Sequence, residues 1–393
     1  MKALIVNCRR NGLAVARSLG KMGVDVIAAD HHRTAPGLYS KYVKERYLIP
    51  PPSPSNNDFV NELVKIGQNH SKTDEPFFLI PVNDEYVLTM AQDWNLLVPY
   101  FLPIFETDVT ILKKCLNKNE TYDLACNCGV PAPQSWINES VEKIENEGNF
   151  PFVVKPVSKR SPENIEKDIF KIRFCTDVEA LRNAVTELNQ KKVKYIVQEY
   201  IPGPDSALYT AGIFAWDGQL VAGFTGRKLR QFPPTTGEAS FAEIVDEPVL
   251  LEYSRSLVQD IEFTGIAQIE FKKHNGSFYL MEVNPRSWSW NALSNQAGVN
   301  LPWIGCQTIK DQQAHNDSQS NNSGTWHYLF MDIFFNGIKS RNTSILRIFR
   351  DCWQADVHAF WNIQDPLPSL IAFLHTVKLT LRFLKRLVAR PFQ

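Results

Sequence analysis

Two glutamates and an asparagine on neighbouring apolar segments have the residue types and spacing of a metal site. The segments 267–273 and 277–282 are predicted strands, and the Asn-Gly pair between them is a hairpin signal. Residues of equal parity share one face of a strand, so we expect Glu270, Glu282 and Asn284 to project together. Two carboxylates and an amide oxygen suit Mg²⁺, which takes further ligands from phosphate oxygens. The alternative is an outer face of solvated charges, but the apolar flanking residues indicate a packed strand.

Lysines elsewhere in the chain supply the complementary positive charge. Lys155 follows the apolar run 151–154 and therefore lies at the end of a predicted buried strand. The ammonium group of a lysine in that place either contacts a phosphate or extends to solvent while the aliphatic stem stays buried. The presence of Lys118, Lys171 and the acidic strands favours the phosphate contact.

The first hundred residues alternate between strand and helix patterns, which predicts a small open parallel sheet with right-handed crossovers. The turn over residues 7–12 lacks the G-x-G-x-x-G spacing that lets a backbone approach a pyrophosphate. A structural domain that forms one wall of a cleft is therefore favoured over a dinucleotide site.

The pattern changes after residue 106. Residues 107–135 are predicted to be helical, and several short strands with hairpin signals follow, which indicates antiparallel sheets and an α+β architecture. Residues 311–325 are polar and predict a linker, and the segment from Trp326 onward is aromatic and helical in pattern.

Composition excludes several classes of protein. The chain has 393 residues, enough for two to three domains, and 42 Lys+Arg balance 42 Asp+Glu, so no net charge favours nucleic acid. Seven irregularly spaced cysteines indicate free thiols in a reducing cytoplasm. We find neither a signal peptide nor an apolar run long enough for a membrane span.

The motifs and their order resemble those of the ATP-grasp superfamily over about residues 1–309. The stretches that carry this resemblance are Leu116-Asn117-Lys118, Gly129-Val130-Pro131-Ala132-Pro133, Pro151-Phe152-Val153-Val154-Lys155-Pro156, Val197-Gln198-Glu199-Tyr200-Ile201-Pro202-Gly203 and Glu282-Val283-Asn284-Pro285-Arg286. Two further stretches, 224–240 and 365–368, are similar to the carbamoyl-phosphate-synthase-like predicted carboligase branch, which includes D-aspartate ligases.

The resemblance implies a domain order. Residues 1–106 would form a Rossmann-like pre-ATP-grasp domain, and residues 107–310 an ATP-grasp domain whose two subdomains, 107–198 and 199–310, clamp ATP. A polar linker over 311–325 would lead to a helical C-terminal extension over 326–393.

The resemblance also implies roles for individual residues. Lys118 and Lys155 would bind the phosphates of ATP, and Lys171 would add positive charge beside them. Gln198, Glu199 and Ile201 would surround the adenine, and Asp205 would bind the ribose hydroxyls. Glu270, Glu282 and Asn284 would hold magnesium, as two ions, with Mn²⁺ as an alternative metal. Arg286 would steady the transferring phosphoryl group, and Arg227 and Lys228 would face the same phosphate or the carboxylate substrate.

The chain departs from the family pattern in two places. The loop over 157–164, which in the family is rich in glycine and covers the phosphates, contains none here, so Lys159 and Arg160 would have to supply charge instead. Biotin carboxylases have a glutamate four residues after their equivalent of Arg286, whereas this chain has Trp290. Trp290 and Trp288 either line a substrate pocket or pack in the core.

Together these features predict an ADP-forming ligase that joins a small carboxylate to a small amine through an acyl phosphate, with no nucleic-acid partner. Two alternatives remain open. One is another ATP-grasp outcome, phosphotransfer or carboxylation without an amide product. The other is a nucleotide-binding scaffold or regulator without turnover.

The C-terminal segment predicts a basic amphipathic helix over residues 369–393. Its basic residues, Lys378, Arg382, Lys385, Arg386 and Arg390, project from one side, and apolar residues occupy most of the opposite side. We expect its apolar face to pack on the protein's own core or on a second subunit of a homodimer. The alternative is peripheral contact with the inner surface of the membrane by an otherwise cytoplasmic protein.

Overall fold

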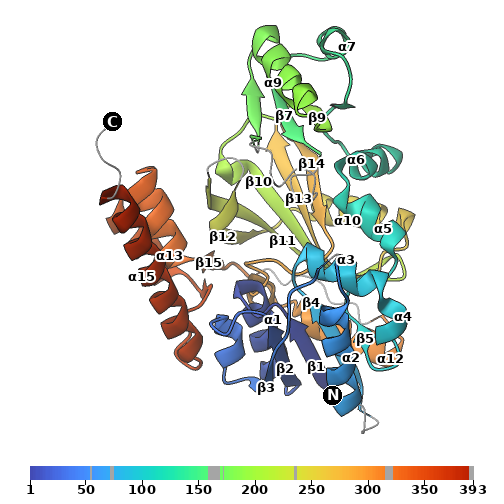
Figure 1. Ribbon diagram of the computed structural model, residues 1–393, viewed down its shortest axis with the longest axis vertical. Coiled ribbons are helices and arrows are strands. Elements are labelled where there is room, and N and C mark those ends of the chain that lie inside the picture. Colours follow the sequence, from blue (N-terminus) through green and yellow to red (C-terminus); the bar gives the residue numbers. More distant parts are fainter. Residues whose placement is uncertain are drawn as a thin grey trace.

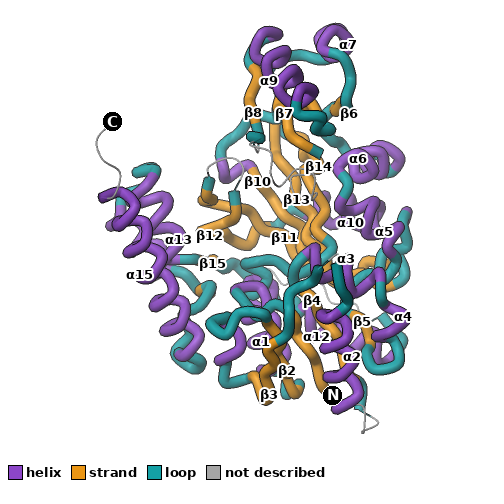
Figure 2. Tube along the Cα trace, in the orientation of Figure 1, coloured by secondary structure: helices purple, strands orange, loops and turns teal. Residues whose placement is uncertain are grey.

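The computed structural model describes residues 1–53, 55–70, 75–157, 169–170, 172–233, 237–314 and 322–388, with side chains through residue 377. Three sheets follow one another along the longest axis of the molecule, with the parallel sheet at the bottom of Figure 1 and the smallest sheet at the top. Strands run through the middle and most helices lie outside them (Figure 2). The predicted combination of α/β and α+β architecture is confirmed.

The first sheet is parallel and has the strand order β3-β2-β1-β4-β5. Its strands are β1 (Lys2–Val6), β2 (Asp25–Asp30), β3 (Val43–Leu48), β4 (Phe77–Pro81) and β5 (Leu102–Pro103). Its helices are α1 (Arg10–Lys21), α2 (Asp58–His70), α3 (Asp84–Gln92) and α4 (Trp94–Leu97), with a 3₁₀ turn η1 (Pro36–Tyr39). Buried central strands explain the continuous apolar runs of β1 and β4.

The smallest sheet is antiparallel and has the order β6-β9-β7-β8. Its strands are β6 (Ser135–Ile137), β7 (Phe152–Pro156), β8 (Arg173–Cys175) and β9 (Tyr195–Glu199), and its helices are α7 (Val141–Glu147) and α9 (Val178–Gln190). Trp136, Phe152 and the buried side of α9 form its own core.

The central sheet has seven strands in the order β14-β13-β10-β11-β12-β15-β16. They are β10 (Leu208–Trp216), β11 (Gln219–Phe232), β12 (Glu238–Val245), β13 (Gly265–His274), β14 (Ser277–Asn284), β15 (Thr325–His327) and β16 (Val357–His358). The associated helices are α10 (Pro248–Asp260), α11 (Leu293–Gln296) and α12 (Leu301–Asp311), and a 3₁₀ turn, η2 (Asp205–Ala207), precedes β10. Both predicted hairpins are present, since Asp217-Gly218 and Asn275-Gly276 have the positive φ angles of tight turns.

The C-terminal extension is less purely helical than predicted. It contains α13 (Leu329–Met331), the π-helix η3 (Asp332–Lys339), α14 (Ile345–Gln354) and α15 (Leu367–Val388), but β15 and β16 also extend the central sheet. Trp326 on β15 is fully buried, so hydrophobic burial draws this strand onto the sheet. The basic side chains predicted at residues 378–390 lie outside the described side chains.

Three buried ion pairs, made by two arginines, hold the extension in place. Arg17 of α1 contacts Asp365 at 2.9 Å, and Asp365 also accepts bonds from the Ser40 hydroxyl and the Lys41 amide. On the central sheet, Arg230 contacts Asp332 and Asp351. The extension therefore joins the first and central sheets, and the motif at 365–368 includes one of its anchors.

The cysteines and the helices can be compared with the expectations from composition. All seven cysteines are free. Among the described residues, no helix combines the length and apolar character needed to cross a bilayer. The division into domains stays a prediction. The strands of the first sheet all lie within residues 1–106, and those of the smallest sheet all lie within residues 107–310, whereas the central sheet also includes β15 and β16 of the C-terminal extension.

Candidate active site

The β13–β14 hairpin brings the predicted metal-binding residues together. Glu270 lies directly opposite Glu282 in the strand register, and Asn284 follows two residues later on the same face. The Asn284 amide donates to Glu282 Oε1 at 3.1 Å. Gln268 Nε2 donates to Glu270 Oε1 at 2.9 Å. The hairpin thus places two carboxylates and two amides in one polar cluster.

Two lysines balance the charge of these carboxylates. Lys228 Nζ lies 2.9 Å from Glu270 Oε1, and Lys118 Nζ lies 3.9 Å from Glu282 Oε2. Burial and the nearby Glu282 raise the pKa of Glu270, against the effect of Lys228. Burial also opposes ionisation of Glu282, but Lys118 and Lys228 outweigh it and lower the pKa of Glu282 to about 2. Glu282 is therefore an anion at neutral pH.

The residues of this cluster fit a magnesium site. Burial and then the neighbouring Glu282 carboxylate raise the pKa of Glu270, and a cation between the two carboxylates would relieve their repulsion. Hard oxygen donors of this kind suit Mg²⁺, which is completed by water and phosphate oxygens. The donor set consists of two carboxylates and an amide, and within the described ranges no group of three or more His, Cys, Asp or Glu could hold a metal.

Lys118 reaches the cluster because the predicted helix over 107–135 is broken. The structure has α5 (Val109–Leu116) and α6 (Lys118–Asn127), with Asn117 in an extended conformation between them. The Asn117 side chain accepts a bond from the Asn119 amide and donates to Glu120 at 2.9 Å. This N-cap starts a second helix and places Lys118 at its first residue.

Lys118 also marks a cleft between the sheets. It lines a cavity of about 280 Å³ with Val157 and Ile196 of the smallest sheet, and a second of about 160 Å³ with Glu282 and Asn284. Because both cavities share Lys118, the cleft connects the smallest sheet with the carboxylate cluster.

The other predicted ATP-binding residues lie on or beside the smallest sheet. Lys155 Nζ donates to Gln198 Oε1 at 3.1 Å across the β7–β9 pair. Glu199 is exposed at the end of β9, and Ile201 is buried. Asp205 accepts bonds from the Gln231 backbone and side chain at 3.2 and 2.9 Å, so a ribose would have to share this carboxylate.

Arg286 lies at the border between the central and first sheets. Its guanidinium donates to both oxygens of Asp84, at 2.8 and 3.3 Å, and to Asn284 Oδ1 at 3.1 Å. Asp84 belongs to α3 of the first sheet. The first sheet thus fixes the arginine next to the carboxylate cluster and forms a wall of the site.

The structure separates Arg227 from Lys228, which were predicted to face the same ligand. Consecutive residues of a strand point to opposite faces, and only Lys228 reaches Glu270. Arg227 instead pairs with Glu243 and contacts the Tyr209 hydroxyl. Arg227 therefore lies outside the carboxylate cluster, and its contact with a ligand stays a prediction.

The tryptophan alternative is settled in favour of the core. Trp288 and Trp290 are 2% and 1% exposed. Trp288 stacks on Phe224 with ring centroids 5.9 Å apart. Both rings are buried against Phe224 of the central sheet, which is a core position.

One group of predicted residues lies outside the described part of the chain. It comprises Lys171 and the loop from residue 158 to 164 with Lys159 and Arg160, and only Val157 of that loop is described. Their proposed contact with phosphate stays a prediction.

Sequence reasoning missed four residues next to the cluster: Gln268, Asp84, Arg10 and Glu238. Gln268 has the same strand parity as Glu270, so the parity rule could have found it. Arg10 of α1 pairs with Glu238 of β12. Arg10 lowers the pKa of Glu238 against the effect of burial, and Arg286 and Lys228 act in the same direction. This charged pair therefore lies near Arg286 and Lys228, where no local spacing could have revealed it.

Comparisons with known proteins agree with this geometry. A family model described as "ATP-grasp in the biosynthetic pathway with Ter operon" matches residues 191–327. Among solved structures, N5-carboxyaminoimidazole synthetase from Staphylococcus aureus is 14% identical and has a TM-score of 0.64, with 85% of this chain and 84% of that chain covered.

Two further structures have the same fold. L-amino acid ligase from Bacillus licheniformis is 15% identical, with a TM-score of 0.60 over 82% of this chain and 78% of that chain. The biotin carboxylase domain of 2-oxoglutarate carboxylase from Hydrogenobacter thermophilus is 14% identical, with a TM-score of 0.61 over 82% of this chain and 73% of that chain. Together with the family match over residues 191–327 and the three sheets described above, these likenesses show that the chain has the ATP-grasp fold.

Proposed function

We propose that this chain is an ATP-dependent ligase that joins a carboxylate to an amine through an acyl phosphate. The observation that carries the proposal is the Glu270–Glu282–Asn284 cluster, held between Lys118 and Lys228 at the end of a cleft. It combines donors for magnesium with cations for phosphate oxygens. The L-amino acid ligase among the structural relatives supports this reaction class.

In the proposed reaction, a carboxylate oxygen attacks the γ-phosphorus of ATP, the bond from that phosphorus to the β–γ bridging oxygen breaks, and ADP leaves. The amine nitrogen then attacks the carbonyl carbon of the acyl phosphate. The bond from that carbon to the phosphate oxygen breaks, phosphate leaves, and the nitrogen gives up a proton. No protein nucleophile is needed, so positioning and electrostatics carry the catalysis.

The residues of the chain have distinct tasks in this scheme. Glu270, Glu282 and Asn284 would hold Mg²⁺, which when bound neutralises charge on the phosphate oxygens. Lys118 and Lys155 orient the phosphates from the two sides of the cleft. Lys228 and Arg286 place positive charge where the transferred group becomes more negative. The MgADP complex of the 2-oxoglutarate carboxylase relative supports magnesium as the metal.

One difference in sequence, at Trp290, favours amide formation over carboxylation. The glutamate with which biotin carboxylases handle bicarbonate is replaced by Trp290, and this ring is buried in the core. The residue at this position therefore offers no carboxylate to the site.

The decisive experiment measures products. The full chain is incubated with ATP, Mg²⁺ and pooled carboxylic acids and amines, and ADP and new masses are read by mass spectrometry. A mass equal to acid plus amine minus water, formed with ADP, is the expected result. ADP without an amide would favour phosphotransfer or carboxylation, and nucleotide binding without ADP formation would favour a scaffold.

Replacing Lys155 with alanine is expected to weaken ATP binding by about tenfold or more, because a charge-assisted bond to phosphate contributes ~1.5–3 kcal/mol. Calorimetric titration with ATP and Mg²⁺ measures the change. Lys143→Ala is the matched control, since Lys143 is an exposed lysine that pairs with Glu139 on the same small subdomain. Unchanged ATP affinity in the Lys155 variant would show that this lysine is a surface residue.

A further inference from the structure

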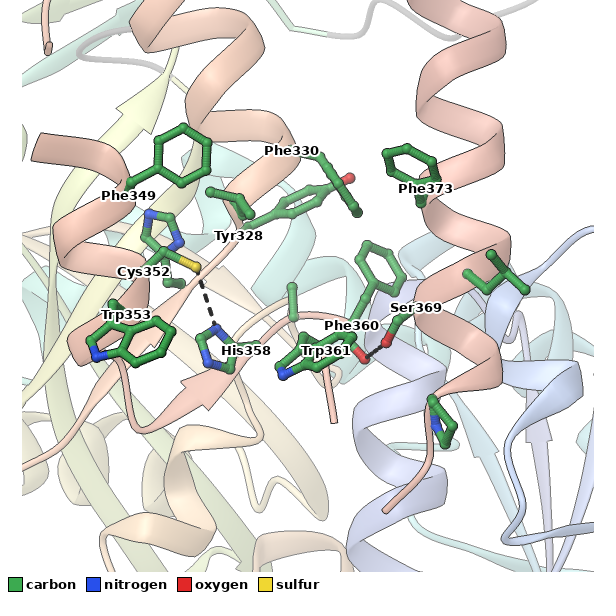
Figure 3. A pocket seen from close by; sticks show the side chains of 15 residues that line it. Tyr328, Phe330, Phe349, Cys352, Trp353, His358, Phe360, Trp361, Ser369 and Phe373 are labelled. Carbon is green, nitrogen blue, oxygen red and sulfur yellow. Dashed lines mark hydrogen bonds between the residues drawn. The ribbon is translucent and has the colours of Figure 1, made fainter. Parts of the chain in front are cut away.

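The C-terminal extension contains a cavity that the proposed reaction does not use. Its volume is about 800 Å³, within the range of small-molecule sites. Figure 3 shows Phe349 and Trp353 of α14 on one side and Phe373 of α15 on the other, with Tyr328 and Phe330 between them. The side chains point toward one another across the space, so the aromatic surface is concave.

The aromatic lining is unusually accessible. Trp353 is 91% exposed, Trp361 is 60% exposed and Phe373 is 47% exposed. Contiguous apolar surface of this kind on a folded protein marks a place where something apolar binds. We therefore expect the occupant of this pocket to be apolar.

A buried histidine on the lining lacks one hydrogen bond. The His327 side chain is 0% exposed, and its Nε2 lies 2.8 Å from Asp332 Oδ2. Its Nδ1 is buried without a partner among the described residues. When Nε2–H donates to the carboxylate, Nδ1 is an acceptor, a tautomer assigned from the partner.

The second polar pair of the pocket is uncharged. Cys352 Sγ lies 3.9 Å from His358 Nδ1. Burial raises the pKa of the Cys352 thiol and lowers the pKa of His358, so both groups are neutral at pH 7. The pair is thus no activated nucleophile, and it leaves the pocket suited to a neutral body.

A basic pocket adjoins the aromatic one. Its volume is about 300 Å³, and Tyr328 and Phe360 line both pockets. Arg9, Arg10 and His32 line it from the first sheet, and His375 lines it from α15. The described lining contains no aspartate or glutamate, although Arg10 pairs with Glu238 at its edge. Such a pocket suits a carboxylate or phosphate group.

We propose that the two pockets form one binding site for an amphiphilic anion, with its apolar body between α14 and α15 and its anionic group at Arg9 and Arg10. Charge complementarity and the shared wall of Tyr328 and Phe360 select this occupant over a wholly apolar one. The site goes beyond the proposed ligase reaction and does not depend on it. A lipid bilayer is the competing occupant, since Trp353 is 91% exposed, but Phe349, Tyr328 and Phe373 face one another across a concave space.

The test uses the full chain without nucleotide and N-dodecanoylglycine below its micellar concentration. This probe carries a carboxylate, an amide N–H and an apolar chain. Calorimetry is expected to show saturable binding. The uncharged methyl ester and the short N-acetylglycine should each bind at least about tenfold more weakly. Absence of binding, or equal affinity for the ester, would overturn the proposal.

Paired variants locate the site. Phe373→Glu and Arg9→Glu should each weaken binding of the probe at least about tenfold, by placing a charge in the apolar pocket or reversing one in the basic pocket. The matched controls are Leu374→Glu, exposed on the same helix, and Arg33→Glu, exposed between the lining residues His32 and Thr34. Neither Leu374 nor Arg33 lines the two pockets, and both variants should bind as the wild type does.

Trp353→Glu serves as a second apolar-pocket variant, because so exposed a residue can be changed without risk to folding. If these variants bind the probe as tightly as the wild type, the site is wrongly placed. If the chain pellets with vesicles of anionic phospholipid but does not bind the monomeric probe, the aromatic surface is a membrane-docking surface and the proposal is wrong. Because no arm uses ATP, a failure of the ligase assay leaves this result unaffected.

Discussion

Replacing Glu282 with alanine should abolish ATP turnover, with a loss of at least about 100-fold, while the fold stays intact. Glu282 is one of only two carboxylates in the proposed magnesium set, and Lys118 and Lys228 hold it ionised. Protein atoms crowd its carboxylate group, but the side chain as a whole is 45% exposed, so its removal leaves no buried cavity. ADP release at saturating Mg²⁺ measures the effect, and circular dichroism checks the fold.

The matched control for this variant is Glu252→Ala, since Glu252 is an exposed glutamate on α10, away from the cluster. It should retain wild-type turnover. A folded Glu282 variant that still hydrolyses ATP at the wild-type rate would remove Glu282 from the metal site, and with it the main support for the reaction proposed above.

Replacing Asp332 with alanine should destabilise the C-terminal extension by ~3–5 kcal/mol, as expected when one partner of a buried ion pair is lost. Asp332 is fully buried and accepts bonds from Arg230, His327, Ser240 and Asn336. Without the carboxylate, the guanidinium of Arg230 keeps only Asp351 as an acidic partner. Hydrogen exchange over β15 and α14, together with urea unfolding, measures the loss.

The stability of the C-terminal extension is expected to depend on pH through the ionisation of Asp332. Burial opposes ionisation of Asp332, but His327 and Arg230 outweigh it and lower its pKa. This stabilisation is therefore fully present above the pKa of the unfolded carboxyl, about 4, and is lost as the pH falls toward the folded pKa.

The control for this prediction is Asp356→Ala, which removes an exposed aspartate that bonds Thr325 and should cost about 1 kcal/mol. Equal stability of the Asp332 and Asp356 variants would show that the buried network does not hold the extension.

The part of the site that the sequence predicted rests on local rules. Strand parity was enough to place Glu270, Glu282 and Asn284 on one face, because both strands belong to a single hairpin. The same rule, applied to β11, would have separated Arg227 from Lys228. The break before Lys118 also has a local signal, since an asparagine followed three residues later by a glutamate is a helix start.

The part that the sequence did not predict depends on contacts between distant segments. Asp84 and Arg286 meet only because the first sheet packs against the central one, and Arg10 and Glu238 meet for the same reason. Periodicity carries no information about such pairs. The short strand β15 was missed because three residues of an aromatic segment do not show the alternation of a strand.

The attachment of β15 bears on how the protein can be shortened. β15 covers the outer edge of β12, where Phe241, Ala242 and Glu243 are paired with it. A chain cut before residue 325 would bare that edge, with its unpaired backbone N–H and C=O groups, and would withdraw Trp326 from the core. Exposed edges of this kind pair with other chains, so the shortened protein would tend to self-associate into aggregates. A minimal catalytic fragment therefore cannot be made by trimming to the polar segment, even though no residue of the carboxylate cluster lies beyond it.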